Sequence, residues 1–501
     1  MKTTRFHAAI AAVALVAFSA PLALAAPAKG DTPVTEAQLA DHIKILASDA
    51  FEGRAPGTEG EDRTIAYIVG EWAKASLEAV PGSATPWLQP VPFVETQALN
   101  GTAKFKVHGR DFAIEDDGII LTGRDPSVSL TGLPAVFVGY GVDGAGKVNA
   151  DVKGKLAIML FDNAPFGDKL PRYRERRQLL ADAGASAVLV IATDAVPWAQ
   201  LRESAGSKAV RLASVKPGAQ VTGFLSLEAA DALLKKAGQD GGAVREAAKA
   251  PDYKGAALPV TVDLATQSAI RPFASNNIIA KLPGAKPDGK AILFLGHWDH
   301  LGICEPEGAA DRICNGAVDN ASGIAVLIEV AKRLGSGARP DRDIYFMATT
   351  AEEKGLLGAH YFADHPVVPL SDITVALNID TIAISPRGAP VATIGRGKPA
   401  YDAVVREAAT KLGRKLDEDG EADAFIQRQD GWALGAKGVT SLMVGGSFSD
   451  MKLLEAFLGS DYHSAADNFS DKIPLGGAAE DADLHVAIGR AFADTKRWPG
   501  K

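Results

Sequence analysis

The chain has 501 residues, with 53 Lys and Arg against 61 Asp and Glu, and a formal net charge of −8. Apolar residues make up 47% and charged residues 23%, which excludes a collagen-like, coiled-coil or largely disordered chain. The acidic balance argues against a nucleic-acid partner. The length predicts two or three domains.

The first 25 residues have the pattern of a secretory signal peptide. Lys2 and Arg5 form a basic start, an apolar run covers residues 8–17, and Ala23 and Ala25 mark a cleavage site. An anchoring helix is the alternative, but the run is shorter than the roughly 20 residues that a membrane span needs. We therefore expect an exported protein, periplasmic or secreted, without stable membrane insertion.

The next part of the chain begins with helices and continues with short strands. Apolar residues at three- and four-residue intervals predict helices over 35–49 and 62–77. After residue 100, short alternating runs between Gly-containing turns predict β structure up to about residue 265. The expected elements there are strands over 102–107, 135–139, 155–160 and 187–191 and a helix over 172–184.

After residue 277, strands and helices alternate. This order predicts an α/β fold with a mostly parallel central sheet and helices on both faces. The expected strands cover 278–280, 291–295, 344–348, 375–379 and 440–444, and the expected helices cover 322–334, 355–363, 401–412 and 478–495.

Residues that can bind a metal follow these strands. In an open α/β sheet, ligands bind at the carboxyl ends of the strands. The chain offers His297 and Asp299 after one strand, Asp319 before a helix, the pair Glu352-Glu353, then Asp380 and, further on, His463. Two histidines with three or four carboxylates suit a pair of divalent metals such as zinc.

Each of these features has an ordinary explanation when it is taken alone. The His297-x-Asp299 spacing is common, Glu352 and Glu353 suit a solvated surface, and Asp319 suits a helix N-cap. Independent accidents do not explain why such residues come at successive strand ends. We therefore predict one metal site.

The motifs H-x-D, G-x-x-D-N-x-S-G, E-E-x-G-L-x-G, N-x-D and Y-H-S resemble those of the co-catalytic dizinc aminopeptidases of clan MH. That family includes glutamate carboxypeptidase, glutaminyl cyclase and the transferrin receptor. Residues 46–61 are similar to its N-terminal signature, and residues 136–142, 151–160 and 183–191 resemble a protease-associated domain.

The resemblance implies a phosphorylase/hydrolase-like zinc exopeptidase fold with an inserted, β-rich protease-associated domain. The implied division is a signal peptide over 1–25, an N-terminal segment of the peptidase domain over 26–105, the inserted domain over 106–265 and the zinc peptidase domain over 266–501.

The resemblance also implies two Zn²⁺ ions, although other divalent metals can bind such ligands. One ion takes His297, Asp319 and Asp380. The other takes Glu353, His463 and the second oxygen of Asp319.

Two further residues receive catalytic roles from the resemblance. Glu352 is the general base that activates a metal-bridged hydroxide, and Asp299 orients His297 through a hydrogen bond. The family also implies a cis peptide bond between Asp319 and Asn320.

The expected activity is that of an exported zinc exopeptidase, an aminopeptidase acting on peptides with free N-termini. A carboxypeptidase is the nearest alternative and needs a basic group for the terminal carboxylate. A glutaminyl cyclase usually shows one metal and no inserted domain. A non-catalytic binding module would have lost ligands or the base, whereas Glu352 is present. The oligomeric state is left open.

Three features carry open alternatives. Cys304 and Cys314 are expected to form a disulfide in an exported chain, with two free thiols as the alternative. Asp430 matches a family motif, and Trp432 and Phe425 line a substrate pocket or serve packing. The basic run 172–177 is a solvated helix face or a docking surface for an acidic chain.

Overall fold

The computed structural model describes residues 32–80, 85–167 and 170–498. The signal peptide expected over residues 1–25 lies outside these ranges. Within them, no helix has both the length and the apolar character that crossing a membrane requires.

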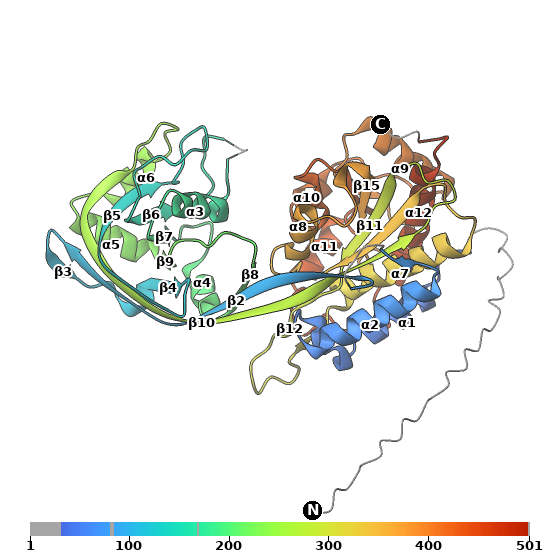
Figure 1. Cartoon of the computed structure of the whole chain (residues 1–501), viewed down its shortest axis with the longest axis horizontal. Helices are drawn as coiled ribbons and strands as arrows, with labels where there is room; N and C mark the ends of the chain where they lie inside the picture. Colours follow the sequence, from blue (N-terminus) through green and yellow to red (C-terminus); the bar gives the residue numbers. More distant parts are fainter. Residues whose placement is uncertain (1–31, 81–84, 168–169, 499–501) are drawn as a thin grey trace, which may run out of the picture.

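Two lobes are joined by two long antiparallel strands (Figure 1). These are β2 (Leu88–Val107) and β10 (Ala256–Leu282), which pair from Leu88 with Ile278 to Val107 with Val260. We call residues 98–265 the inserted lobe and the rest of the described chain the major lobe. Because both strands run through both lobes, fifteen strands of the described residues form one continuous sheet, and two short strands, β12 (Gly302–Ile303) and β13 (Ile313–Cys314), form a second.

The sheet of the major lobe has a parallel centre. Its strand order is β16-β17-β15-β11-β14-β10, in which β17, β15, β11 and β14 are parallel and the two outer strands are antiparallel. The bounds are β11 Ala291–His297, β14 Asp343–Thr349, β15 Ile373–Asn378, β16 Ala392–Ile394 and β17 Ser441–Gly445. A short strand, β1 (Glu78–Ala79), pairs with β10.

Helices cover both faces of this sheet. Phe294 of β11 packs in the core shared with the larger helix layer, whereas its neighbour Leu295 packs against Phe362 and Leu434 on the other face. The larger layer contains α1 (Glu36–Leu46), α2 (Glu59–Lys74), α7 (Gly323–Ser336), α9 (Pro399–Lys411) and α12 (Leu475–Ala493), and the smaller contains α8 (Leu357–Asp364) and α10 (Gly431–Gly435). The predicted fold class, a mostly parallel sheet between two helix layers, is confirmed.

The inserted lobe contains a second parallel unit. Strands β5 (Ser127–Gly139), β6 (Leu156–Leu160), β7 (Ala187–Ile191) and β9 (Val221–Leu225) are parallel, and β4 (Ile119–Gly123) closes the edge. Its helices are α3 (Tyr173–Asp182), α4 (Trp198–Ser204), α5 (Leu227–Lys236) and α6 (Gly241–Ala247). Strands β3 (Arg110–Phe112) and β8 (Lys208–Leu212) pair with β2. The expected domain limits at 105 and 265 fall inside β2 and β10.

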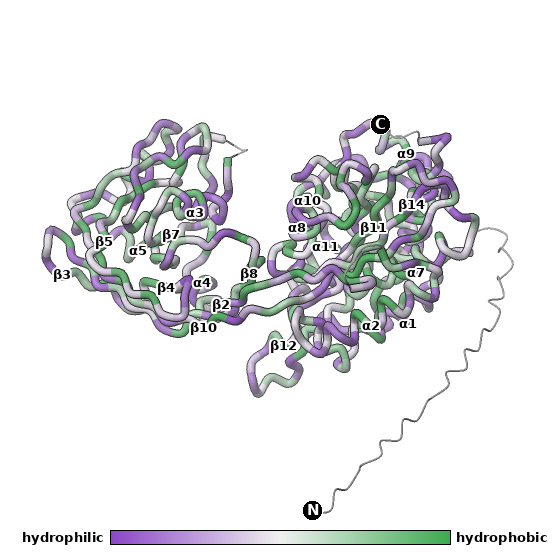
Figure 2. Tube along the Cα trace, viewed as in Figure 1, coloured by the Kyte–Doolittle hydropathy of each residue, from purple (hydrophilic) through white to green (hydrophobic). Residues whose placement is uncertain are grey.

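Apolar strands occupy the centre of each lobe. Figure 2 shows β11 and β7 in the colour of hydrophobic residues, and every residue of both strands is buried. Burial on both faces explains why these strands are continuous apolar runs rather than alternating ones. The predicted spans 187–191 and 291–295 match these strands because such runs are visible in sequence.

A buried histidine on α12 makes the stability of this core depend on pH. His485 is fully buried, its Nδ1 lies 2.7 Å from the carbonyl oxygen of Asp481, and its Nε2 has no partner among the described residues. Burial lowers the pKa of His485 to about 4. The unfolded chain, where the pKa is about 6.5, therefore binds a proton that the folded chain excludes.

We predict that His485→Asn makes the protein less sensitive to acid. Asparagine keeps an amide donor near the carbonyl of Asp481 and does not titrate. In the native protein, the contribution of His485 to the free energy of unfolding is complete above pH ~6.5. It falls by about 3 kcal/mol as the pH decreases toward 4. Melting temperatures between pH 7 and 4.5 should fall more steeply for the native protein than for the variant, and parallel curves would refute this account.

Candidate metal centre

Parallel strands deliver most of the predicted ligands to one edge of the sheet. His297 ends β11, Glu352 and Glu353 follow β14, and Asp380 comes two residues after β15. These three strands are neighbours in the order β15-β11-β14, so their carboxyl ends lie together. Asp319 precedes α7, and His463 follows α11 (Met451–Leu458).

The carboxylate of Asp319 lies between the two histidines. Its Oδ1 is 3.2 Å from Nε2 of His297, and its Oδ2 is 3.4 Å from Nε2 of His463. Asp380 Oδ1 lies 3.4 Å from the same nitrogen of His297, and Glu353 Oε2 lies 2.8 Å from that of His463. The structure thus brings the five predicted ligands together in two groups that share Asp319.

This donor set fits a pair of divalent cations. Ligand atoms of His297, Asp319 and Glu353 all lie within 4.8 Å of one another. Burial would lower the pKa of His297, but the carboxylates of Asp380, Glu352 and Asp319 outweigh it and raise the pKa well above its usual value. A site that draws positive charge so strongly, with imidazole and carboxylate donors, suits zinc.

Glu352 lies beside this group without joining it. Its Oε2 is 4.0 Å from Nε2 of His297, and it lines a cleft together with Asp319 and Asp380. No described residue donates a hydrogen bond to its carboxylate. Burial, reinforced by the charge of Glu353, raises the pKa of Glu352 well above its usual value. This carboxylate is therefore free to take up a proton in the cleft.

Asp299 supports the site differently from the prediction. Nδ1 of His297 lies 3.1 Å from the backbone carbonyl oxygen of Asp299 and 3.9 Å from its carboxylate. The carboxylate instead accepts a 3.0 Å hydrogen bond from the backbone N–H of Glu352. Asp299 thus orients the histidine through its main-chain carbonyl group. Its carboxylate, whose pKa burial raises to about 7, holds the Glu352–Glu353 loop (residues 351–356).

Two carboxylate contacts at the site were not predicted from the sequence. Asp467 accepts hydrogen bonds from the backbone N–H groups of Val318 and Asp319, at 2.9 and 3.0 Å. Nδ1 of His300 lies 2.6 Å from Oε1 of Glu353, which leaves the other oxygen of that glutamate toward His463. The only sequence signal for the contact between His300 and Glu353 is that His300 belongs to the H-W-D-H run.

A buried arginine supports the loops beneath the site. Arg54 donates to the carbonyl oxygens of Trp298 and Gly316, both at 2.9 Å, and to those of Leu46 and Asn315. Burial lowers its pKa to about 10, so it keeps its charge at neutral pH. Arg54 lies in the segment 46–61 that resembled the family signature, which is the signal that pointed to it.

The structure also gives the positions of the predicted cis peptide bond, the two cysteines and the two predicted substrate-binding residues. The Asp319–Asn320 peptide bond is cis, and Cys304 is joined to Cys314 by a disulfide. Trp432 is 37% exposed on α10 and does not line the cleft. Asp430 is buried beneath the site and accepts a hydrogen bond from Thr349.

The cleft is lined by both acidic and apolar side chains. The acidic ones are Asp319, Glu352 and Asp380. The other side chains are mostly apolar and include Phe425, which the sequence analysis had proposed, with Met443, Phe448, Leu454 and Leu458. Tyr462 also lines it, and its ring stacks on that of His463 at 3.7 Å between centroids.

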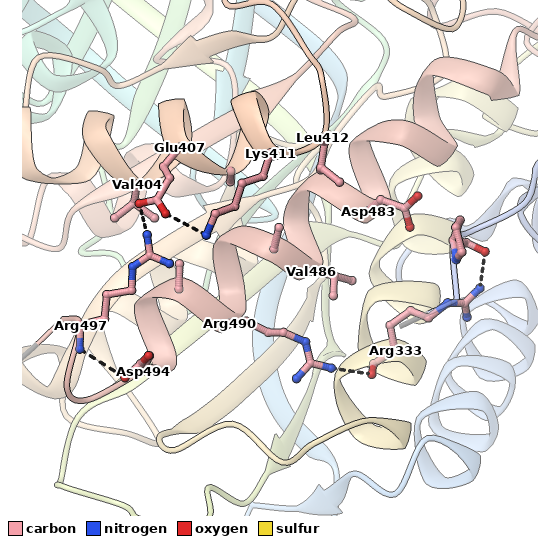
Figure 3. A pocket seen from close by; sticks show the side chains of 14 residues that line it. Arg333, Val404, Glu407, Lys411, Leu412, Asp483, Val486, Arg490, Asp494 and Arg497 are labelled. Carbon is pink, nitrogen blue, oxygen red and sulfur yellow. Dashed lines mark hydrogen bonds and ion pairs between the residues drawn. The ribbon is translucent and has the colours of Figure 1, made fainter. Parts of the chain in front are cut away.

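A second hollow lies between α9 and α12, away from the metal ligands (Figure 3). Its charged side chains pair with one another, since Glu407 contacts both Lys411 and Arg497. These ion pairs offset much of the charge that would otherwise attract a charged ligand.

The profile of Peptidase family M28 matches residues 277–487 of this chain, a range that contains the five predicted ligands. The chain carries a Peptidase family M28 domain. The chain is 28% identical over 373 residues to the probable leucine aminopeptidase 2 of Aspergillus oryzae, covering 72% of this chain and 63% of the relative. It is 26% identical over 340 residues to Aminopeptidase YwaD of Bacillus subtilis, covering 68% and 60%. The chain thus spans less than two thirds of each of these two relatives.

Two solved structures share the fold across both lobes of this chain. An aminopeptidase from Aneurinibacillus sp. has a TM-score of 0.54 at 18% identity, covering 92% of this chain and 94% of its own. BSAP, a zinc aminopeptidase from Bacillus subtilis, has a TM-score of 0.50 at 20% identity, covering 93% and 97%. At these identities the similarity establishes the fold alone.

We predict that chelation lowers the melting temperature of the M28 domain, and that added zinc restores it. Without cations the clustered carboxylates repel one another, and a ligand that binds only the folded state stabilises it by about 2.7 kcal/mol at 100 times its Kd. Differential scanning calorimetry measures the change. The matched control is Asp319→Ala, which should respond little to chelator, and a native melting curve unchanged in excess chelator would contradict the prediction.

Proposed function

We propose that the protein is an exported zinc aminopeptidase that removes single residues from peptides with free N-termini. The observation that carries the proposal is the arrangement around Asp319, with an unbonded Glu352 carboxylate 4.0 Å from Nε2 of His297. The family of the domain and the printed names of its relatives support the same activity.

Two groups of ligands would hold the metals. His297, Asp319 and Asp380 would bind one zinc ion, and Glu353, His463 and the second oxygen of Asp319 would bind the other. When bound, zinc lowers the pKa of water and polarises a substrate carbonyl.

Glu352 moves the proton in this proposal. Its carboxylate accepts a proton from the attacking water and passes it to the nitrogen of the leaving amine. The raised pKa of Glu352 makes it a stronger base than an exposed glutamate. The hydrogen bond from its backbone N–H to Asp299 holds it in place.

The character of the cleft favours an amino terminus over a carboxyl terminus. With zinc on the ligand carboxylates, Glu352 is the acidic lining residue left without a metal in this proposal, and it would attract a free ammonium group. The adjoining apolar side chains, Phe425 and Met443 among them, suit an uncharged first residue. The second histidine–carboxylate group and the inserted lobe argue against a glutaminyl cyclase.

Export and the domain assignment belong to the same proposal. The pattern of residues 1–25 supports a signal peptide, and the disulfide between Cys304 and Cys314 suits an oxidising compartment. We assign the inserted lobe as a protease-associated domain, on the resemblance of its strands β5, β6 and β7.

The test uses a mixed peptide pool in which half of the peptides are N-acetylated copies of the other half. Mass spectrometry should find single-residue losses from the N-terminus in the free half alone. Losses from the C-terminus in both halves would make the protein a carboxypeptidase.

We predict that Glu352→Gln keeps the fold and both metals but lowers kcat by roughly 10²- to 10⁴-fold, because it removes the general base. Metal content and the melting temperature should stay near the native values. Glu455→Gln, a substitution at an exposed position on α11, is the control and should retain full activity. A Glu352→Gln enzyme with native kcat would overturn the assigned role.

A further inference from the structure

The inserted lobe presents an unusual basic segment at the start of α3. Arginine occupies positions 172, 174, 176 and 177 in a chain whose net charge is −8. Arg176 has a structural role, since it is buried and donates to the carbonyl oxygens of Tyr140 and Phe161 at 2.7 and 3.0 Å. Arg172 and Arg174 are exposed, and neither makes an ion pair with a carboxylate of the described residues.

Arg174 lies against the Glu352–Glu353 loop. Its Nη1 would be 3.5 Å from a Cβ built on Gly355, which comes two residues after Glu353. In Figure 1, α3 is on the side of the inserted lobe that faces the major lobe. An arginine of the inserted lobe therefore lies next to the metal-binding loop of the other lobe.

The side chain of Arg174 is held in this position. Its Nε donates a 3.1 Å hydrogen bond to the hydroxyl of Tyr173, and its guanidinium carbon is 5.9 Å from the centre of that ring. The ring of Tyr173 packs in turn against that of Phe161, with 4.4 Å between centroids and 33° between the ring planes. Because this guanidinium group is already fixed in one orientation, it loses less conformational entropy when it binds an anion.

Two cations of the major lobe add to the positive charge around the cleft. Lys354 directly follows Glu353, and neither Lys354 nor Arg428 pairs with a carboxylate among the described residues. Arg428 lines the cleft and donates to the hydroxyl of Tyr462 at 3.3 Å. Glu352, which holds no metal in the proposed assignment, is an acidic group in the cleft, whereas these positive groups lie around it. A peptide with a positive amino end and a negative group further along matches this order of charge.

We infer that Arg174 is a specificity-determining residue that binds a carboxylate of the substrate on the leaving-group side of the scissile bond. The inference rests on the proposed aminopeptidase function. Gly355 is two residues from the ligand Glu353, so a carboxylate bound by Arg174 belongs to the part of the peptide beyond the cleaved bond rather than to its first residue. The C-terminus of a short peptide and an acidic side chain both supply this group.

Three matched peptides distinguish the two sources. Leu-Ala-Ala-Asn-amide has no carboxylate, Leu-Ala-Ala-Asp-amide has one on its side chain, and Leu-Ala-Ala-Asn with a free C-terminus has one on its main chain. The measured quantity is kcat/KM for release of the leucine. The native protein should favour the two carboxylate peptides by about fivefold, and the advantage should shrink with added salt.

Variants of Arg174 test the assignment directly. Arg174→Ala should lose the fivefold advantage while its kcat/KM on the amide without carboxylate stays near native, and Arg174→Lys should recover part of it. Arg110→Ala removes one exposed arginine from β3, at the far end of the inserted lobe, and should leave the advantage intact (Figure 1).

Equal ratios of kcat/KM in the native protein and in Arg174→Ala would overturn the inference. Hydrolysis of the neutral amide would still establish the aminopeptidase in that case. No hydrolysis of any of the three peptides by the native protein would contradict the proposed function itself.

Discussion

The shared carboxylate of Asp319 is the constraint on which the rest of the site depends. Its two oxygens lie 3.2 and 3.4 Å from Nε2 of His297 and of His463, which come from opposite ends of the domain sequence. Clustering acidic residues out of water costs free energy unless cations offset their charge. Two sets of hydrogen bonds hold the surrounding loops in this arrangement. Asp467 accepts them from backbone N–H groups, and Arg54 donates them to backbone carbonyl oxygens.

The same site gives two adjacent residues, Glu352 and Glu353, different chemical properties. Glu353 lies 2.6 Å from His300 and 2.8 Å from His463, and these contacts outweigh the effect of burial and lower its pKa to about 2. Glu352 has no such partners, and burial raises its pKa. Neighbouring glutamates thus differ in basicity because their surroundings differ, one suited to bind metal and the other to accept a proton.

The inserted lobe is connected to this chemistry through packing as well as through its linking strands. Leu212 of β8 and Phe93 of β2 share a buried cluster with Ala351, the residue before Glu352. Arg174 lies against Gly355 at the other end of the same loop. A lobe that contacts both ends of the Glu352–Glu353 loop is well placed to influence which peptides reach it.

Features that depend on local patterns along the chain were predictable from the sequence, whereas those that depend on contacts between distant segments were not. The apolar runs of β7 and β11 and the polar residues at strand ends are local patterns. Most of β2 was missed because Pro90 and Pro92 argue against a strand. The hydrogen bonds of Asp467 to the segment at Asp319 join residues about 150 positions apart, and no spacing rule reveals them. Trp432 was expected in the cleft, but α10 leaves it exposed.

A crystal structure with anomalous scattering recorded at the zinc edge tests the central claim most directly. The account predicts two peaks, one beside each oxygen of Asp319, at about 2.0–2.2 Å from it. One ion should lie toward His297 and Asp380 and the other toward Glu353 and His463. A single peak in zinc-saturated protein, or two peaks that do not share Asp319, would contradict the account.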